Sequence, residues 1–137
     1  MVDFEVLEHT ADVGIRAYGA DITEAFANAA RGLFSLITEP DDIREVEERE
    51  IELTADDQES LLVNWLNELI YLFDTENIVF KRFDITQLDD NQLKAKCYGE
   101  RADISRHKIK TGVKGTTYHM LAIERNDGYK VEVLFDI

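Results

Sequence analysis

The sequence predicts an α+β fold with two layers, in which two α-helices pack on one face of a largely antiparallel β-sheet. Three observations predict it. Apolar and polar residues alternate with the period of a strand near both ends of the chain, and two longer stretches between them repeat with the period of a helix. The run Arg125–Gly128 supplies residues that tolerate positive φ, as a hairpin requires. For 137 residues, we expect one domain spanning residues 1–137.

The first two strands are predicted for residues 2–8 and 13–18. In both segments every second residue is apolar, the pattern of a strand with one buried face. A turn through Thr10 and Ala11 joins them, and Gly19 ends the second strand. The chain therefore begins with two neighbouring strands.

The first helix is predicted from Ile22 to Ile37. Asp21 and Glu24 stand three residues apart at its start, so the aspartate side chain can accept from an early helical N–H and the glutamate can reach back. Pro40 closes the unit. The predicted buried stripe comprises Phe26, Ala29, Ala30, Leu33, Phe34 and Ile37.

The second helix is predicted from Gln58 to Asp74, with Asp56 and Glu59 repeating the capping spacing. Trp65 lies at its middle, and its aromatic ring is expected in the core rather than in a ligand site. The apolar face of this helix is broad and comprises Leu61, Leu62, Trp65, Leu66, Leu69, Ile70 and Phe73.

The remaining segments read as strands and one loop. Residues Ile43–Thr54 alternate but are acidic, as suits an exposed strand whose charges discourage edge-to-edge pairing. Asp103–Gly115 is a basic loop. Four further strands are predicted at Ile78–Ile85, Leu93–Gly99, Thr116–Glu124 and Tyr129–Ile137.

The net charge of −14, from 29 acidic and 15 basic residues, makes direct, stable binding of nucleic acid unexpected, because phosphates need a cationic surface. The basic residues gather between Lys94 and Lys114, so either one basic face or interspersed surface charge is possible. No apolar run is long enough for a signal peptide or a membrane span. The single cysteine, Cys97, falls on an apolar face as a buried thiol and fits a reducing cytoplasm.

The residues most capable of chemistry are acidic and lie far apart in the sequence. Asp12 follows His9 at a turn, where a carboxylate and an imidazole can finish the turn, share a proton or bind a metal. Asp136 precedes Ile137, whose terminal carboxylate would add oxygen ligands. Asp12, Asp136 and Ile137 together would suit Ca²⁺, Mg²⁺ or Mn²⁺, although no local spacing brings Asp12 beside Asp136.

His119 and Lys114 form a second candidate set. His119 alternates onto a face with Leu121 and Ile123, which favours a structural histidine with its hydrogen bonds satisfied. Lys114 and His119 also stand beside the basic loop, where they could contact a phosphate or a carboxylate. There is no Gly-rich phosphate loop, CxxC, HExxH or GxSxG motif.

Five motifs together resemble the archease family over essentially the whole chain. None would suffice alone, but they occur in the family's order and in a chain of the family's size. They are His9–Ile15, the alanine-rich helix ending at Gly32–Phe34, Leu61–Leu66, Lys114–His119 and Phe135–Ile137.

The resemblance implies a cytoplasmic, non-catalytic protein cofactor of the RtcB-type RNA ligase of tRNA splicing. Such a cofactor promotes guanylylation of the ligase, supports multiple turnover and alters its NTP specificity. A tRNA methyltransferase is a further partner that the family implies. The family's metal site, Ca²⁺ being the favoured ion, falls on Asp12, Asp136 and Ile137, and Lys114 is among its functional positions. His9 then supports the turn that aims Asp12.

Two alternatives from other classes remain. One is a metal-dependent phosphoesterase that uses His9, Asp12, His119 and Asp136 directly. The other is a general chaperone or modulator of nucleic-acid-processing enzymes, which would need a large exposed apolar patch. The absence of a nucleophile motif and of a phosphate loop disfavours an enzyme. The chaperone is disfavoured because the apolar residues all fit two helices and a sheet, which leaves no such patch visible in the sequence.

Overall fold

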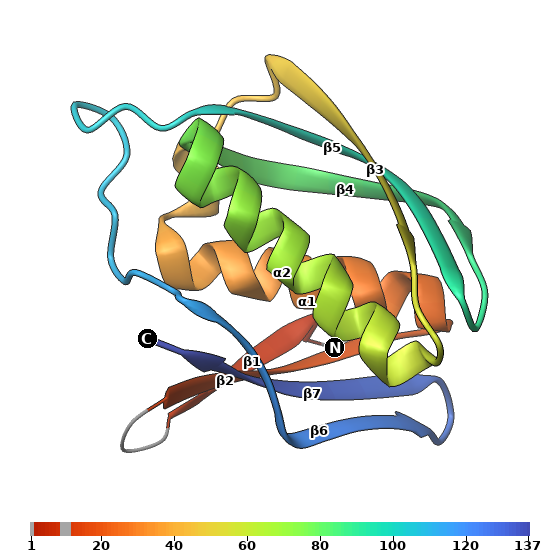
Figure 1. The fold of residues 1–137 in the computed structure, drawn as a ribbon. Coiled ribbons are helices and arrows are strands. Elements are labelled where there is room, and N and C mark those ends of the chain that lie inside the picture. The colour runs from red at the N-terminus through yellow and green to blue at the C-terminus, as the bar shows by residue number, and fades with distance from the viewer. Residues whose placement is uncertain (1, 9–11) are drawn as a thin grey trace.

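Two antiparallel β-sheets enclose a layer of two α-helices in the computed structural model of the chain, which describes residues 2–8 and 12–137 (Figure 1). The elements are β1 (Phe4–Glu8), β2 (Asp12–Gly19), α1 (Ile22–Ile37), a 3₁₀ turn (Pro40–Asp42), β3 (Glu47–Thr54), α2 (Gln58–Glu76), β4 (Ile78–Leu88), β5 (Gln92–Arg101), β6 (Gly115–Arg125) and β7 (Tyr129–Asp136).

The α+β class, the antiparallel pairing and the two helices are as predicted, whereas the single sheet covered on one face is not observed. The strands divide into a four-stranded sheet in the order β1-β2-β7-β6 and a three-stranded sheet in the order β3-β5-β4. Both helices contact both sheets. A helix that is apolar on opposite sides must be covered on each of them, and the buried residues of α2 include Leu61, Leu62, Val63, Trp65, Leu66, Leu69 and Ile70.

The helices begin at side-chain caps and are joined through a buried aromatic residue. Asp21 Oδ1 accepts from the Glu24 N–H at 2.8 Å, as predicted. For α2 the cap is Asp57, one residue later than the predicted Asp56, because Asp57 Oδ1 accepts from the Ser60 N–H at 2.7 Å. Trp65 is fully buried and donates its indole N–H to the Phe26 carbonyl of α1 at 3.0 Å. It is a core residue, as expected.

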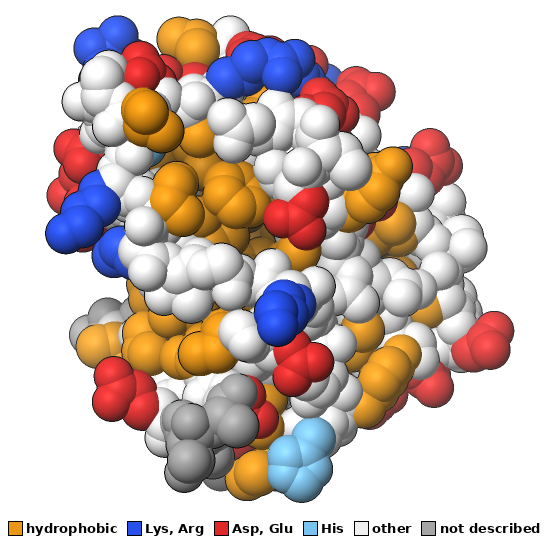
Figure 2. Space-filling model, turned by 60° about the vertical axis from the view of Figure 1, so that its left-hand side comes forward, with side chains coloured by type: hydrophobic (Ala, Val, Ile, Leu, Met, Phe, Trp, Pro, Cys, Tyr) orange, Lys and Arg blue, Asp and Glu red, His pale blue; other side chains and the backbone are white. Residues whose placement is uncertain are grey.

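In the three-stranded sheet, basic residues of β5 lie opposite acidic residues of the edge strand β3. Strand β3 starts at Glu47, later than the predicted Ile43, and lies at the sheet edge with its charges outward, as predicted. Lys94 and Lys96 of β5 lie opposite Glu52 and Glu50 of β3. Figure 2 shows Lys and Arg side chains near Asp and Glu side chains around the margin of the face that it draws, with hydrophobic side chains gathered toward the middle. Interspersed charge is therefore the arrangement that this face presents.

The burial of the single cysteine agrees with the sequence. Cys97 of β5 is buried, and burial raises the pKa of its thiol. A raised pKa leaves the thiol protonated and unreactive near neutral pH. Within the described ranges, neither helix combines the length and the apolar character that crossing a membrane requires.

Candidate functional site

The sheet register brings Asp12 and Asp136 together. Strands β2 and β7 are antiparallel, and Asp12, the first residue of β2, lies directly opposite Asp136, the last residue of β7. On the other side of β7, Asp136 lies opposite Gly115, the first residue of β6. Three strands thus meet in one row at the end of the sheet where the chain terminates (Figure 1).

Directly opposed residues of an antiparallel pair point to the same face, with Cβ atoms about 4.5–5.5 Å apart. That separation allows the carboxylates of Asp12 and Asp136 to share one cation with ligand bonds of roughly 2.3–2.6 Å. Asp136 is exposed and Asp12 is half-buried. In the part of the chain that the structure describes, neither carboxylate has a hydrogen-bond or ion-pair partner. Both are therefore free to bind a ligand from outside that part.

The carboxylates stand on the outer face of the four-stranded sheet, which neither helix covers. Phe135 is fully buried on the inner face, so its neighbour Asp136 points outward. In the next outward-facing row along these strands, Gly14 lies opposite Leu134 on one side and Leu7 on the other. A Cβ at Gly14 would come within 2.8 Å of the Leu134 side chain. Leu134 packs closely on Gly14, so the two aspartates are followed along their strands by an apolar contact.

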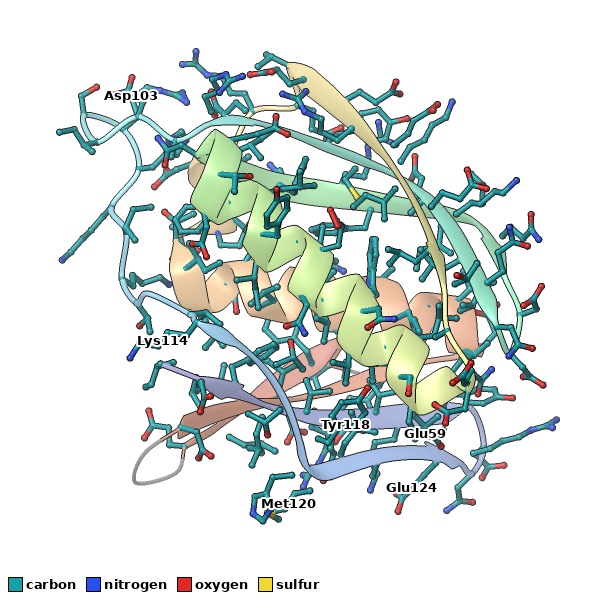
Figure 3. The ribbon with its side chains drawn as sticks, in the orientation of Figure 1. Glu59, Asp103, Lys114, Tyr118, Met120 and Glu124 are labelled. Atoms are coloured by element: carbon teal, nitrogen blue, oxygen red, sulfur yellow. The ribbon has the colours of Figure 1, made fainter. Side chains whose placement is uncertain are left out.

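Lys114 adjoins the pair through the backbone. Its N–H donates to the Asp136 carbonyl at 2.8 Å, and its side chain is exposed at the end of the loop that precedes β6 (Figure 3). Asn67 of α2 accepts from the Thr116 N–H at 2.8 Å. This bond fixes the start of β6 to the helix. Sequence reasoning missed Asn67, since a polar residue on an apolar helix has no recognisable pattern.

The remaining predicted site residues have different outcomes. Ile137 follows β7 directly and is 47% exposed. His9 lies outside the described residues. The prediction of a satisfied structural histidine at position 119 is wrong, because His119 is exposed. The alternation with Leu121 and Ile123 fails because the register of β6 against β7 shifts between Thr117 and Ala122.

A second polar cluster, centred on Glu100 and His107, was not predicted. His107 is 1% exposed, and its Nδ1 accepts from the Asp103 N–H at 2.8 Å. Its Nε2 therefore carries the proton in the neutral ring and faces the Asp42 carbonyl at 3.0 Å and Glu100 at 3.1 Å. Arg106 also pairs with Glu100. The cluster holds the loop that leads to Lys114 against the body of the protein.

Electrostatics in this cluster favour the charged carboxylate. Burial, the largest influence, acts to raise the pKa of Glu100. Hydrogen bonds from the Arg44 N–H, Arg106 and His107 outweigh it, and the pKa lies below its ordinary value. A carboxylate that is held charged by several donors in this way stabilises the fold around it.

The paired aspartates fit a hard divalent cation in chemistry and placement, since carboxylate oxygens are the ligands such ions take. They are two side-chain ligands, and no group of three or more His, Cys, Asp or Glu that could hold a metal occurs among the described residues. Main-chain oxygens of Ile137, water or another molecule would have to complete the coordination.

The chain matches one protein family over nearly its whole length. The model of the Archease protein family (MTH1598/TM1083) matches residues 4–137. The protein archease of Saccharolobus solfataricus is 45% identical over 139 aligned positions, covering 100% of both chains. That of Methanosarcina mazei is 39% identical, covering 98% of this chain and 95% of the relative.

Solved structures agree with the fold. The solution structure of Methanobacterium thermoautotrophicum protein 1598 superposes with a TM-score of 0.80 at 36% identity, covering 98% of this chain and 99% of that one. The crystal structure of a Thermotoga maritima protein, described as an archease and possible chaperone, gives a TM-score of 0.66 at 26% identity and covers 97% and 96%. These related structures therefore support the fold of two sheets around two helices.

Proposed function

The chain belongs to the archease family, and from this premise we propose that it is a cytoplasmic, non-catalytic protein cofactor of an RtcB-type RNA ligase in tRNA splicing. In this role it promotes guanylylation of the ligase, allows multiple turnover and alters NTP specificity. The observation that carries the proposal is the row formed by Asp12, Asp136 and Gly115 at the end of the sheet, with Lys114 beside it. Small-molecule substrates are usually enclosed in a concave pocket, whereas this row stands open at a sheet end.

The residues of the row have separate roles. Asp12, Asp136 and the main-chain oxygens of Ile137 hold a divalent cation, with Ca²⁺ favoured and Mg²⁺ or Mn²⁺ as the other candidates. When bound, such a cation supplies positive charge that can neutralise phosphate oxygens. Lys114 contributes a compact, mobile positive charge next to the carboxylates. His119 is exposed on β6 and is available for contact with the partner.

Charge supports a protein partner rather than RNA itself. An enzyme that binds RNA needs a basic surface, and the net charge of this chain is −14. Opposite charges on two proteins accelerate their association. The same argument admits a tRNA methyltransferase as a further partner. Stable direct binding of nucleic acid is not part of the proposal.

The test is guanylylation of the purified cognate ligase in the presence of wild-type, Asp12→Ala or Asp136→Ala protein. We expect wild-type stimulation to be lost in both variants, because each removes a carboxylate from the row. Asp90→Ala is a matched control, since it removes an exposed aspartate carboxylate from the turn between β4 and β5, in the other sheet. Undiminished stimulation by both aspartate variants would refute the proposal.

A general chaperone role is the second candidate, because the Thermotoga maritima relative is described as a possible chaperone. It predicts suppression of aggregation for unrelated proteins, with no dependence on Asp12. Incubating the protein alone with RNA or nucleotides and Mn²⁺ examines the phosphoesterase alternative in the same series. Turnover without the ligase would favour that enzyme activity over the cofactor role.

A further inference from the structure

Strand β6 is interrupted where it should pair continuously with β7. Gly115–Thr117 lie opposite Asp136–Leu134, and pairing resumes with Ala122 opposite Glu132. Residues 118–121 therefore stand opposite Val133 alone. We call this segment the β6 bulge. Bulges of this kind re-aim side chains and are common at sheet edges and beside active sites.

The bulge contains an unfavourable backbone conformation. Met120 has φ of 57°, in the left-handed region. The other non-glycine residues with positive φ in the described ranges are Asn77 and Asp127, at 55° and 53°. Asn and Asp tolerate this region because their short polar side chains bond locally, which methionine cannot do. Such strain concentrates at functional positions.

Two large side chains with apolar surface are exposed within the bulge. Tyr118 and Met120 are each 58% exposed, and Figure 3 shows Met120 projecting from the outer edge of the sheet. Tyr and Met are enriched at protein interfaces, and the flexible Met side chain adapts to irregular apolar surfaces. The bulge thus places two interface-type side chains in solvent at an energetic cost.

The bulge lies close to the candidate site. Tyr118 follows Gly115 by three residues, which corresponds to about 10 Å along a strand, and Gly115 is opposite Asp136. A protein that covers the paired aspartates would also reach the bulge. The acidic Glu59 and Glu124, exposed on α2 and β6, belong to the two elements that pack together at this edge. The partner surface should therefore combine an apolar recess with surrounding Lys or Arg.

We propose that the β6 bulge is the apolar docking contact for the RNA ligase named above, with Tyr118 and Met120 entering a recess on its basic surface. This inference rests on the proposed function, because it takes the same partner. The opposing explanation is that the bulge only blunts an edge strand against aggregation. In that case the identity of its side chains would not affect binding of the ligase.

The experiment uses Met120→Gly and Tyr118→Ser, with Tyr71→Ser as the control. Glycine adopts positive φ without strain, so Met120→Gly should melt at the same or a higher temperature than the wild-type protein. Tyr71 is 60% exposed on α2, which matches Tyr118 in type and exposure. Affinity for the purified ligase, measured by biolayer interferometry, should fall about tenfold or more in each bulge variant and stay unchanged in the control.

The outcomes separate the two proposals. Wild-type protein that binds the ligase, with Met120→Gly and Tyr118→Ser binding equally well, would overturn the docking role of the bulge and leave the proposed function standing. Wild-type protein that neither binds nor stimulates the ligase would overturn both. A stable Met120→Gly protein with weakened binding supports the inference, because loss of folding cannot then explain the weaker binding.

Discussion

The cluster around Glu100 and the sheet end around Asp136 use the same kinds of side chain but differ in what those side chains contact. Glu100 accepts from the Arg44 N–H at 2.6 Å and also pairs with Arg106 and His107. The Asp136 carboxylate has no such partner within the described ranges. Acidic side chains bound by several donors hold the fold together, whereas carboxylates that lie opposite each other on neighbouring strands without such donors are available for function.

This difference predicts the largest stability effect at Glu100. Glu100→Gln removes the charge that Arg106 and the surrounding donors require, leaving them in a site where the glutamate side chain is only 11% exposed. Loss of one partner from a largely buried ion pair costs about 3 kcal/mol. Urea denaturation at neutral pH measures this loss in the free energy of unfolding. A loss below about 1 kcal/mol would show that the cluster does not anchor the loop.

The sheet end predicts the next largest effect, which depends on metal. The proposed site stabilises the wild-type protein by about 2.7 kcal/mol when free Ca²⁺ is about 100 times its Kd. Asp136→Asn should lose this gain, yet without Ca²⁺ it should fold at least as well as wild type, because it relieves repulsion with Asp12. Thermal melting of wild type and Asp136→Asn, each with and without Ca²⁺, measures the stability that Ca²⁺ adds to each protein. Equal Ca²⁺-dependent gains would contradict the site.

Acid should weaken the Glu100 cluster in a defined direction. The folded-state pKa of Glu100 is lowered from 4.5, so the unfolded chain takes up the proton first as the pH falls. The contribution is complete above about pH 4.5 and is lost below it, by at most about 1.4 kcal/mol per pH unit. Denaturation midpoints of wild type and Glu100→Gln should therefore converge below pH 4.5. Parallel curves would contradict the assignment.

A smaller effect is expected at Asn67, which connects the helix layer to the candidate site. Asn67→Ala leaves the Thr116 N–H without its acceptor and should cost about 1 kcal/mol. Asn67→Asp keeps an acceptor oxygen and is the matched control. Amide hydrogen exchange at Thr116 reports the bond directly. Faster exchange in the alanine variant alone is the expected result.

The helices could be predicted from the sequence because their signals are local. The range Ile22–Ile37 and the cap at Asp21 follow from periodicity and spacing within a few residues of each other. The second sheet could not be predicted, because strand alternation shows that a face is buried but not which element covers it.

The site was only partly predictable for the same reason. Asp12 and Asp136 were recognisable as chemically capable residues, but their opposition depends on the register of strands from the two ends of the chain. His107 was missed because its bond to the Asp42 carbonyl spans 65 residues of sequence, and the turn that brings Glu100 and Asp103 to its ring has no periodic pattern. His119 was misjudged because alternation assumes an unbroken strand, and the β6 bulge breaks it.

The most direct test of the central claim compares the two regions in one assay. Guanylylation of the purified ligase is measured at a temperature where both Asp136→Asn and Glu100→Gln remain folded. The account predicts that the stable Asp136→Asn protein fails to stimulate. The less stable Glu100→Gln protein should stimulate as wild type does, because the bond from the Lys114 N–H to the Asp136 carbonyl still positions Lys114. Full stimulation by Asp136→Asn would contradict the claim that the exposed sheet end carries the function.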